Sequence, residues 1–99
     1  MTNAEFLNDL VPDLSQGLKD AVMTARGVSP LAVYSGDSAI ELAEADLYMR
    51  MLIIPEFKEG SLSIKYDVRS LKESANRIYL RYGDSRYDNG EPLIQRQKL

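Results

Sequence analysis

The sequence predicts a mainly α protein: a small helical bundle of four helices plus a short helical turn, with one extended strand or hairpin loop and a C-terminal arm. Three observations support this prediction. Apolar residues recur at helical spacing in four segments, a residue type that caps helices precedes each segment, and Pro or Gly follows each one. A chain of 99 residues suffices for one domain. We therefore expect a single helical domain over residues 1–83 and an extended arm over residues 84–99.

The first helix is expected to begin at Asn3. Thr2 and Glu5 form a capping-box pattern, in which the hydroxyl and the carboxylate each accept a hydrogen bond from a backbone amide at the start of the helix. Pro12 ends the helix, because proline cannot donate a backbone hydrogen bond and its ring clashes with the preceding turn.

A second helix is expected to follow, with Asp13 or Ser15 as its N-cap and Arg26 with Gly27 as its C-terminal signal. Residues 29–34 begin with Ser-Pro, which predicts one short helical turn. The apolar residues of the second helix lie at helical spacing and are expected to face the core: Leu14, Leu18, Ala21, Val22 and Ala25.

The strongest helical pattern begins at Asp37 or Ser38 and runs to about Ile54. Its second half, residues 47–54, is apolar nearly all round, which is typical of a helix surrounded by protein. We expect this helix to be central, with Leu47 in the core and another subunit covering whatever its own chain leaves exposed.

Two charged residues of this central helix, Asp46 and Arg50, lie four positions apart. Side chains at that spacing lie on the same side of a helix, so we expect the two residues to pair on the surface.

Residues 61–66 alternate strictly between polar and apolar side chains, with Leu62, Ile64 and Tyr66 on one face. This period of two predicts a strand, entered through a turn over residues 56–60. A lone strand cannot satisfy its own backbone hydrogen bonds. The strand is therefore expected to pair either within the chain, with residues 92–95, or across a subunit boundary.

The last helix is expected over residues 68–82, with Asp67 as its N-cap and Gly83 as its C-terminal cap. One face is apolar and includes Val68, Leu71, Ala75, Ile78, Tyr79 and Tyr82. The opposite face is basic, with Arg69, Lys72, Arg77 and Arg81 interrupted by Glu73.

Composition argues against catalysis. The chain has no cysteine and no histidine, which excludes disulfides, thiol nucleophiles, Cys/His zinc sites and catalytic triads that use a histidine base. Glu41 and Glu44 form an acidic pair at helical spacing, but no third ligand accompanies them. We expect no enzyme activity, no metal and no cofactor.

The net charge of −3 conceals an asymmetry. Residues 1–49 carry eight acidic and two basic residues, a net charge of −6, whereas residues 50–99 carry ten basic and seven acidic residues, a net charge of +3. Such a chain can meet a copy of itself head to tail or bind a separate basic partner. Alternatively, both halves are simply solvated faces of one domain.

The basic face of the last helix allows two interpretations. Nucleic-acid phosphates could be contacted by the four basic residues Arg69, Lys72, Arg77 and Arg81. Alternatively, these residues form a solvated face in which Glu73 pairs with Arg69 and Arg77, four positions away on either side. The alternative function is thus a small helical nucleic-acid- or protein-binding module.

Over residues 38–84 the chain resembles small structural proteins of tailed phages and prophages, particularly those of Bacteroides-type hosts. The resemblance rests on AEADLY at residues 43–48, EGSLSIKY at residues 59–66, and ANRIY followed by YGD within residues 75–84. In organisation the chain is similar to head-to-tail connector (neck adaptor) proteins, although its short N-terminal helices and the segment after Gly83 depart from their pattern.

The resemblance implies a non-enzymatic virion structural protein of the neck, assembled in the bacterial host cytoplasm. Copies of the chain would form a homo-oligomeric ring, commonly dodecameric, between the portal and the tail-side neck proteins, and DNA would pass through the lumen without sequence readout.

The first residues do not resemble a secretory signal, and the longest apolar run, residues 51–55, is far shorter than the roughly 20 residues that span a membrane. The expected subunit or partner interface consists of Glu59, Gly60, Leu62, Ile64 and Tyr66 in the loop, with Met49 and Ile53 of the central helix.

Overall fold

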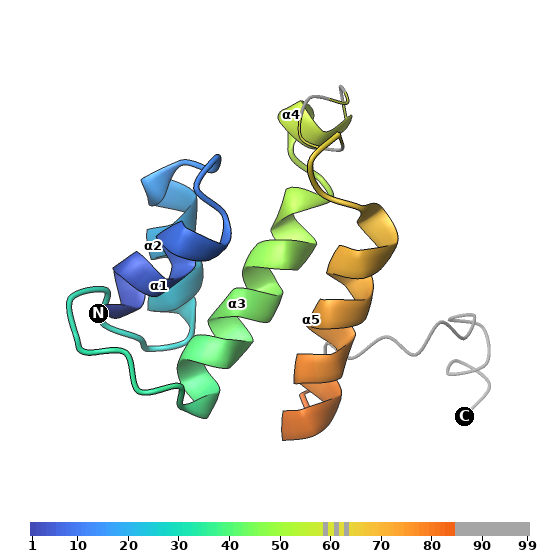
Figure 1. Cartoon of the computed structure of the whole chain (residues 1–99). Helices are drawn as coiled ribbons and strands as arrows, with labels where there is room; N and C mark the ends of the chain where they lie inside the picture. The colour runs from blue at the N-terminus through green and yellow to red at the C-terminus, as the bar shows by residue number, and fades with distance from the viewer. Residues whose placement is uncertain (59, 61, 63, 85–99) are drawn as a thin grey trace.

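A computed structural model describes residues 1–58, 60, 62 and 64–84, and this part of the chain is mainly helical, as predicted. The helices are α1 (Asn3–Leu10), α2 (Gln16–Ala25), α3 (Ser38–Met51), α4 (Pro55–Lys58) and α5 (Val68–Tyr82). Helix α3 lies in the centre, with α1 and α2 on one side and α5 on the other (Figure 1). The predicted arm over residues 84–99 lies outside the described residues, apart from Asp84.

The predicted caps set the helix boundaries. In the capping box of α1, the Glu5 amide donates to Thr2 Oγ1 at 3.2 Å and the Thr2 amide donates to Glu5 Oε1 at 2.7 Å. Of the two candidate caps of α2, Ser15 is the N-cap, because its side chain accepts a hydrogen bond from the Leu18 amide in the first turn. Asp37 caps α3 and Asp67 caps α5 in the same way.

The C-terminal boundaries of the two long helices differ in how well they were predicted. Helix α5 ends at Gly83, which adopts the left-handed conformation at a φ of 64°. Helix α3 ends at Met51, three residues before the predicted Ile54, and Pro55 opens the short helix α4 instead of a plain turn.

Helices α1, α2 and α3 share a core that reaches the loop before α5, and a second cluster joins α3 to α5. Leu47 is fully buried in the first cluster, and Ile78 is 8% exposed in the second. The two ends of the predicted apolar face of α5, Val68 and Tyr82, are exposed to solvent.

The buried face of α2 differs from the predicted one. Val22 is buried as predicted, but Ala21 and Ala25 are exposed, and Lys19 and Met23 are buried in addition. The prediction followed the apolar residues, but this helix turns a lysine toward the core, where Lys19 Nζ donates to Asn8 Oδ1 of α1 at 2.8 Å. Burial lowers the pKa of Lys19.

The segment between α2 and α3 runs beside the N-terminus. The predicted turn is shorter than expected, since its hydrogen bond joins the Ala32 amide to the Ser29 carbonyl and the chain is extended by Tyr34. The Tyr34 amide donates to the Met1 carbonyl at 2.9 Å, and the Tyr34 ring stacks on Phe6 with centroids 4.1 Å apart. Helix α1 is thereby fastened to this segment.

The predicted strand over residues 61–66 is wrong for the residues that the structure describes there. The amides of Lys65 and Tyr66 both donate to the Leu62 carbonyl at 3.0 Å, so this backbone forms turns. The expected common face is also absent, because Leu62 is buried while Ile64 is 86% exposed. Local turns satisfy backbone groups that lack a neighbouring strand. The proposed pairing partner, residues 92–95, lies outside the described residues.

Side-chain contacts hold this loop against the connection between α1 and α2. Lys65 Nζ lies 3.3 Å from Asp13 Oδ1, and the Tyr66 hydroxyl donates to Asp13 Oδ2 at 3.0 Å. Both hydrogen bonds lower the pKa of the Asp13 carboxyl, and the one from Tyr66 has the larger effect.

Truncation of the core at Leu47 tests this packing. We expect Leu47→Ala and Ile78→Ala each to lower the free energy of unfolding by about 2–5 kcal/mol, because each leaves a cavity that the rigid helices fill only in part. Leu80→Ala is the matched control, since Leu80 is 61% exposed on α5. Urea unfolding measures all three; losses under about 1 kcal/mol at both core sites would contradict the arrangement of the helix faces.

Candidate interaction surfaces

A buried ionic cluster joins α2, α3 and the end of α5. Asp46 of α3 accepts three hydrogen bonds: from Arg26 Nε at 2.7 Å, from Arg26 Nη2 at 3.0 Å and from the Tyr79 hydroxyl at 2.7 Å. The remaining amino group of Arg26, Nη1, donates to Asp84 Oδ2 at 2.9 Å. The hydrogen bonds to Asp46 raise the pKa of the Arg26 guanidinium above its ordinary value.

The expected surface pair of Asp46 with Arg50 is therefore wrong. Arg26 caps the C-terminus of α2 and presents a planar, two-pronged donor to the carboxylate, a geometry that bidentate arginine pairs favour. Arg50 is exposed and has no ion pair among the described residues.

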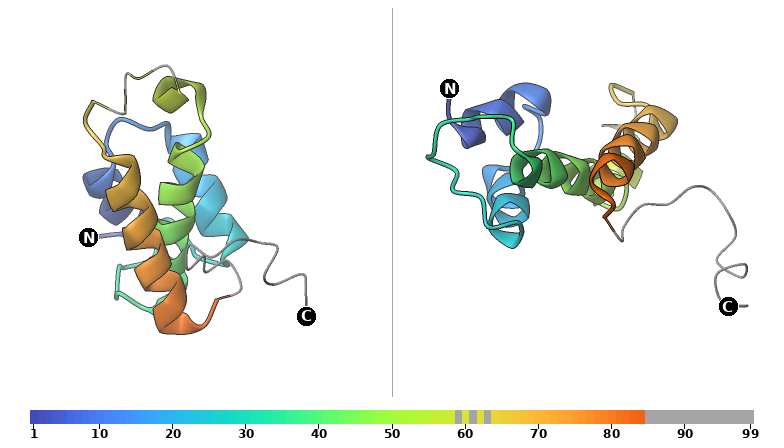
Figure 2. Two further views of the ribbon diagram at one scale, coloured as in Figure 1. Left: turned by 90° about the vertical axis from the view of Figure 1, so that its right-hand side faces the viewer. Right: turned by 90° about the horizontal axis from the view of Figure 1, so that it is seen from below.

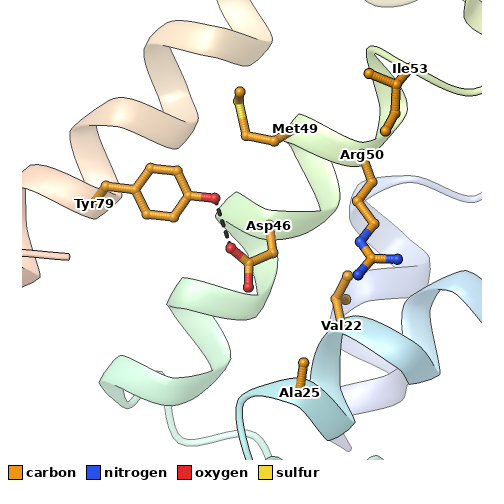
Figure 3. Close-up of a pocket in the computed structure, with 7 residues that line it drawn as sticks. All are labelled: Val22, Ala25, Asp46, Met49, Arg50, Ile53 and Tyr79. Carbon is orange, nitrogen blue, oxygen red and sulfur yellow. Dashed lines mark hydrogen bonds between the residues drawn. The ribbon is translucent and has the colours of Figure 1, made fainter. Parts of the chain in front are cut away.

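Next to this cluster lies a pocket of about 200 Å³, called here the α3 pocket (Figure 3). Helix α3 and its C-terminal extension supply the floor, α2 one wall and α5 the other. The pocket contains two of the predicted interface residues, Met49 and Ile53, and Ile53 is 66% exposed. Its lining residues are Val22, Ala25, Asp46, Met49, Arg50, Ile53 and Tyr79.

None of the described loop residues of the predicted interface lines this pocket. Leu62 belongs to the core and Tyr66 is bonded to the connection between α1 and α2, whereas Ile64 projects into solvent. Gly60 is half-buried in a turn, and Glu59 lies outside the described residues. Of the described loop residues in this predicted set, Ile64 is the one left exposed for a partner.

The structure places the four basic residues of α5 in solvent. Arg69, Lys72, Arg77 and Arg81 are all exposed, and the first three form no ion pair within the described part of the chain. Arg81 Nη1 lies 3.2 Å from Glu41 Oε1 of α3, and the Tyr82 hydroxyl donates to the same oxygen. These contacts clamp the last turn of α5 to the first turn of α3.

The acidic pair Glu41 and Glu44 is engaged by other side chains. Glu41 is bound by Arg81 and Tyr82, and Glu44 Oε2 accepts a hydrogen bond from the Tyr48 hydroxyl at 2.7 Å. Burial raises the pKa of the Glu44 carboxyl. Across the described residues, no group of three or more acidic side chains is arranged to hold a metal ion.

Together, the fold and the surfaces define a small all-α protein with an ionic cluster between its helices, a pocket lined by apolar and charged side chains, and a basic helix face. The chain belongs to a protein family, described as a family of unknown function (DUF6706), whose sequence profile matches residues 1–98. No curated protein and no solved structure matches the chain. Within the described part, none of the helices has both the length and the apolar character needed to cross a membrane.

Loss of the Asp46 carboxylate should be severe. Asp46→Ala leaves the largely buried Arg26 without its bidentate partner, and we expect a loss of about 3–5 kcal/mol in the free energy of unfolding. Tyr79→Phe removes one hydrogen bond to a charged group and should cost about 1.5–3 kcal/mol. Chemical denaturation compares both with Arg50→Ala, an exposed lining residue expected to change stability by less than about 0.5 kcal/mol. Equal losses for Asp46→Ala and Arg50→Ala would contradict the role of the cluster.

Glu44 makes stability depend on pH. Because burial raises its pKa above the ordinary value of 4.5, the folded state binds this proton more tightly than the unfolded state. The free energy of unfolding therefore falls as pH rises from about 4.5 through the folded pKa. Glu44→Gln keeps an acceptor for Tyr48 and abolishes the titration, so its stability relative to wild type should be greater at pH 7 than at pH 4.

Urea unfolding at both pH values tests this expectation. Glu73→Gln, an exposed glutamate on α5, is the matched control and should show a smaller change between the two pH values. A difference between Glu44→Gln and wild type that is the same at pH 4 and pH 7 would count against a raised pKa at Glu44.

Proposed function

We propose that this protein is a non-enzymatic, ring-forming head-to-tail connector of a phage or prophage particle. It would join portal and tail in the virion neck and let DNA pass through the ring. The resemblance over residues 38–84 motivates the proposal. The observation that carries it is the separation of charge across α3.

Part of the charge of the two halves belongs to helices on opposite sides of α3, while Glu41 and Glu44 lie on α3 itself. The exposed basic residues Arg69, Lys72 and Arg77 belong to α5, whereas exposed Asp9 and half-buried Asp20 belong to α1 and α2, on the other side of α3 (Figure 2). Placed side by side, the α5 of one copy would meet the α1 and α2 of the next. A contact between two different surfaces can repeat from one copy to the next. The copies form a ring if the rotation between neighbours closes after a whole number of copies.

Exposed apolar residues also lie on both sides of α3. Ile64 and Val68 lie where the chain enters α5, and Leu31 and Val33 lie in the segment beside the N-terminus, on the other side of α3. All four are large aliphatic side chains with much of their surface in water. Contiguous exposed apolar surface marks sites of association, and these residues would supply apolar area to a contact on either side of the molecule. Two unlike patches suit a head-to-tail contact better than a two-fold dimer.

Neutralising each charged side separately tests the head-to-tail contact. The basic-side variant is Arg69→Ala/Lys72→Ala/Arg77→Ala, and the acidic-side variant is Asp9→Asn/Asp20→Asn. Wild type should form higher assemblies at low salt, alone or on portal protein, and each variant alone should not. A mixture of the two variants should stop at dimers, because each partner offers one intact side.

Sedimentation velocity measures these sizes, and negative-stain imaging checks for closed rings. Glu73→Ala serves as the control, since it alters α5 without removing a basic residue. A wild-type chain that stays monomeric at low salt and does not bind portal protein would contradict the proposal.

A second candidate function, nucleic-acid binding, is favoured by the three basic residues of α5 that have no ion pair within the described structure. If this face binds phosphates, a DNA mobility shift should weaken steeply with salt. Arg77→Ala/Arg81→Ala should lower the slope of log K against log salt by roughly one for each phosphate that the variant no longer neutralises. Absence of any shift at low salt would remove this function.

A further inference from the structure

We propose that the α3 pocket is the binding site for residues 91–94 of the same chain, Glu-Pro-Leu-Ile, with the Leu93 and Ile94 side chains against its apolar walls and the Glu91 carboxylate beside Arg50. The pocket would thus take a short segment that combines one carboxylate with adjacent aliphatic side chains.

The pocket has the chemistry for such a segment. Its walls carry the aliphatic side chains of Val22, Ala25 and Ile53, and Met49 with its flexible thioether (Figure 3). An apolar cavity of about 150 Å³ takes up a molecule as large as benzene, so about 200 Å³ has room for a branched aliphatic side chain.

The two charged lining residues differ in availability. Asp46 is engaged by Arg26 and Tyr79, so it offers little to a ligand. Arg50 is exposed and has no ion pair among the described residues, so its guanidinium remains open to a carboxylate. The pocket therefore favours an acidic occupant over a basic one.

The described chain ends at the edge of this pocket. After the left-handed Gly83, the Asp84 amide donates to the Tyr79 carbonyl at 2.9 Å, and the Asp84 carboxylate binds Arg26. Arg26 joins Asp84 to Asp46, which lines the pocket. Asp84, the last described residue, is therefore linked by hydrogen bonds to two residues that line the pocket, directly to Tyr79 and through Arg26 to Asp46.

The remaining 15 residues have the required length and composition. Residues 85–91 can extend by about 3.3–3.6 Å each, roughly 25 Å in total. The pocket from Asp46 to Ile53 covers roughly 10 Å at a helical rise of about 1.5 Å per residue. Within residues 85–99, Leu93 and Ile94 are the one pair of adjacent aliphatic residues, and Glu91 precedes them by two positions.

Attachment at Asp84 favours the chain's own segment over that of another molecule. A binding segment joined to its site by a short length of the same chain has an effective concentration in the millimolar range, so even a weak contact is occupied without assembly. The docking is independent of ring formation, and it is tested on the monomer; failure of one therefore leaves the other unaffected.

A spin label tests the docking directly. The chain has no cysteine, so Gln95→Cys accepts a single nitroxide. In dilute samples we expect loss of NMR signal at the backbone amides that line the pocket, with no change on further dilution. The amides to be followed are those of Val22, Ala25, Met49 and Ile53.

Two matched variants carry the same label. Leu93→Ser/Ile94→Ser should restore the signals, and Arg50→Glu should restore them in part. Adding Glu91→Arg to Arg50→Glu should bring the signal loss back. No signal loss in the labelled protein, or a loss that the Leu93→Ser/Ile94→Ser variant leaves unchanged, would overturn the proposal.

A mixture of spin-labelled chain and unlabelled, isotope-enriched chain distinguishes docking within one chain from docking between two copies. Signal loss confined to the mixture would mean that the segment of a neighbouring copy occupies the pocket, which also overturns docking within one chain. An Arg50→Glu variant with the full signal loss of wild type would overturn the contact between Glu91 and Arg50.

Discussion

The bidentate pair between Arg26 and Asp46 is the contact on which the rest of the structure depends. Helix α3 touches α2 on one side and α5 on the other, and this pair, with the Tyr79 hydroxyl, is where all three meet. An arginine at the end of one helix and an aspartate in the middle of the next fix both the rotation of α3 and its position along α2. A hydrophobic contact tolerates sliding, whereas two parallel hydrogen bonds to one carboxylate do not.

Sequence reasoning located the helices well because caps are local. Ser15, Asp37 and Asp67 act within three residues of themselves, so their effect can be read from the neighbouring sequence. The faces of α2 were harder to predict. Its buried side carries Lys19, and a partner on α1 stabilises that burial. A helix that turns a charged residue inward buries a face that differs from the apolar stripe in its sequence, and the prediction followed that stripe.

Partners distant in the chain were missed for a similar reason. The spacing of Asp46 and Arg50 favoured a local pair, but Asp46 binds Arg26, 20 residues earlier, and Tyr79, 33 residues later. Strict alternation over residues 61–66 likewise predicted a strand. Alternation describes the side chains alone, and a strand also needs a neighbour for its backbone. Among the predicted interface residues, Met49 and Ile53 do share one pocket, because both lie on α3 and its C-terminal extension.

Asp84 changes where the folded unit ends. Helix α5 is capped at Gly83, and a boundary drawn by secondary structure would stop there. The carboxylate of the next residue, Asp84, accepts a hydrogen bond from Arg26 Nη1. The folded unit therefore includes one residue that belongs to no helix. A chain shortened to 83 residues would lose a ligand of its central ion pair, whereas one shortened to 84 would keep it. An experiment that removes the C-terminal segment to test its role should therefore keep Asp84. A deletion that also removes Asp84 would change stability through the loss of its bond to Arg26.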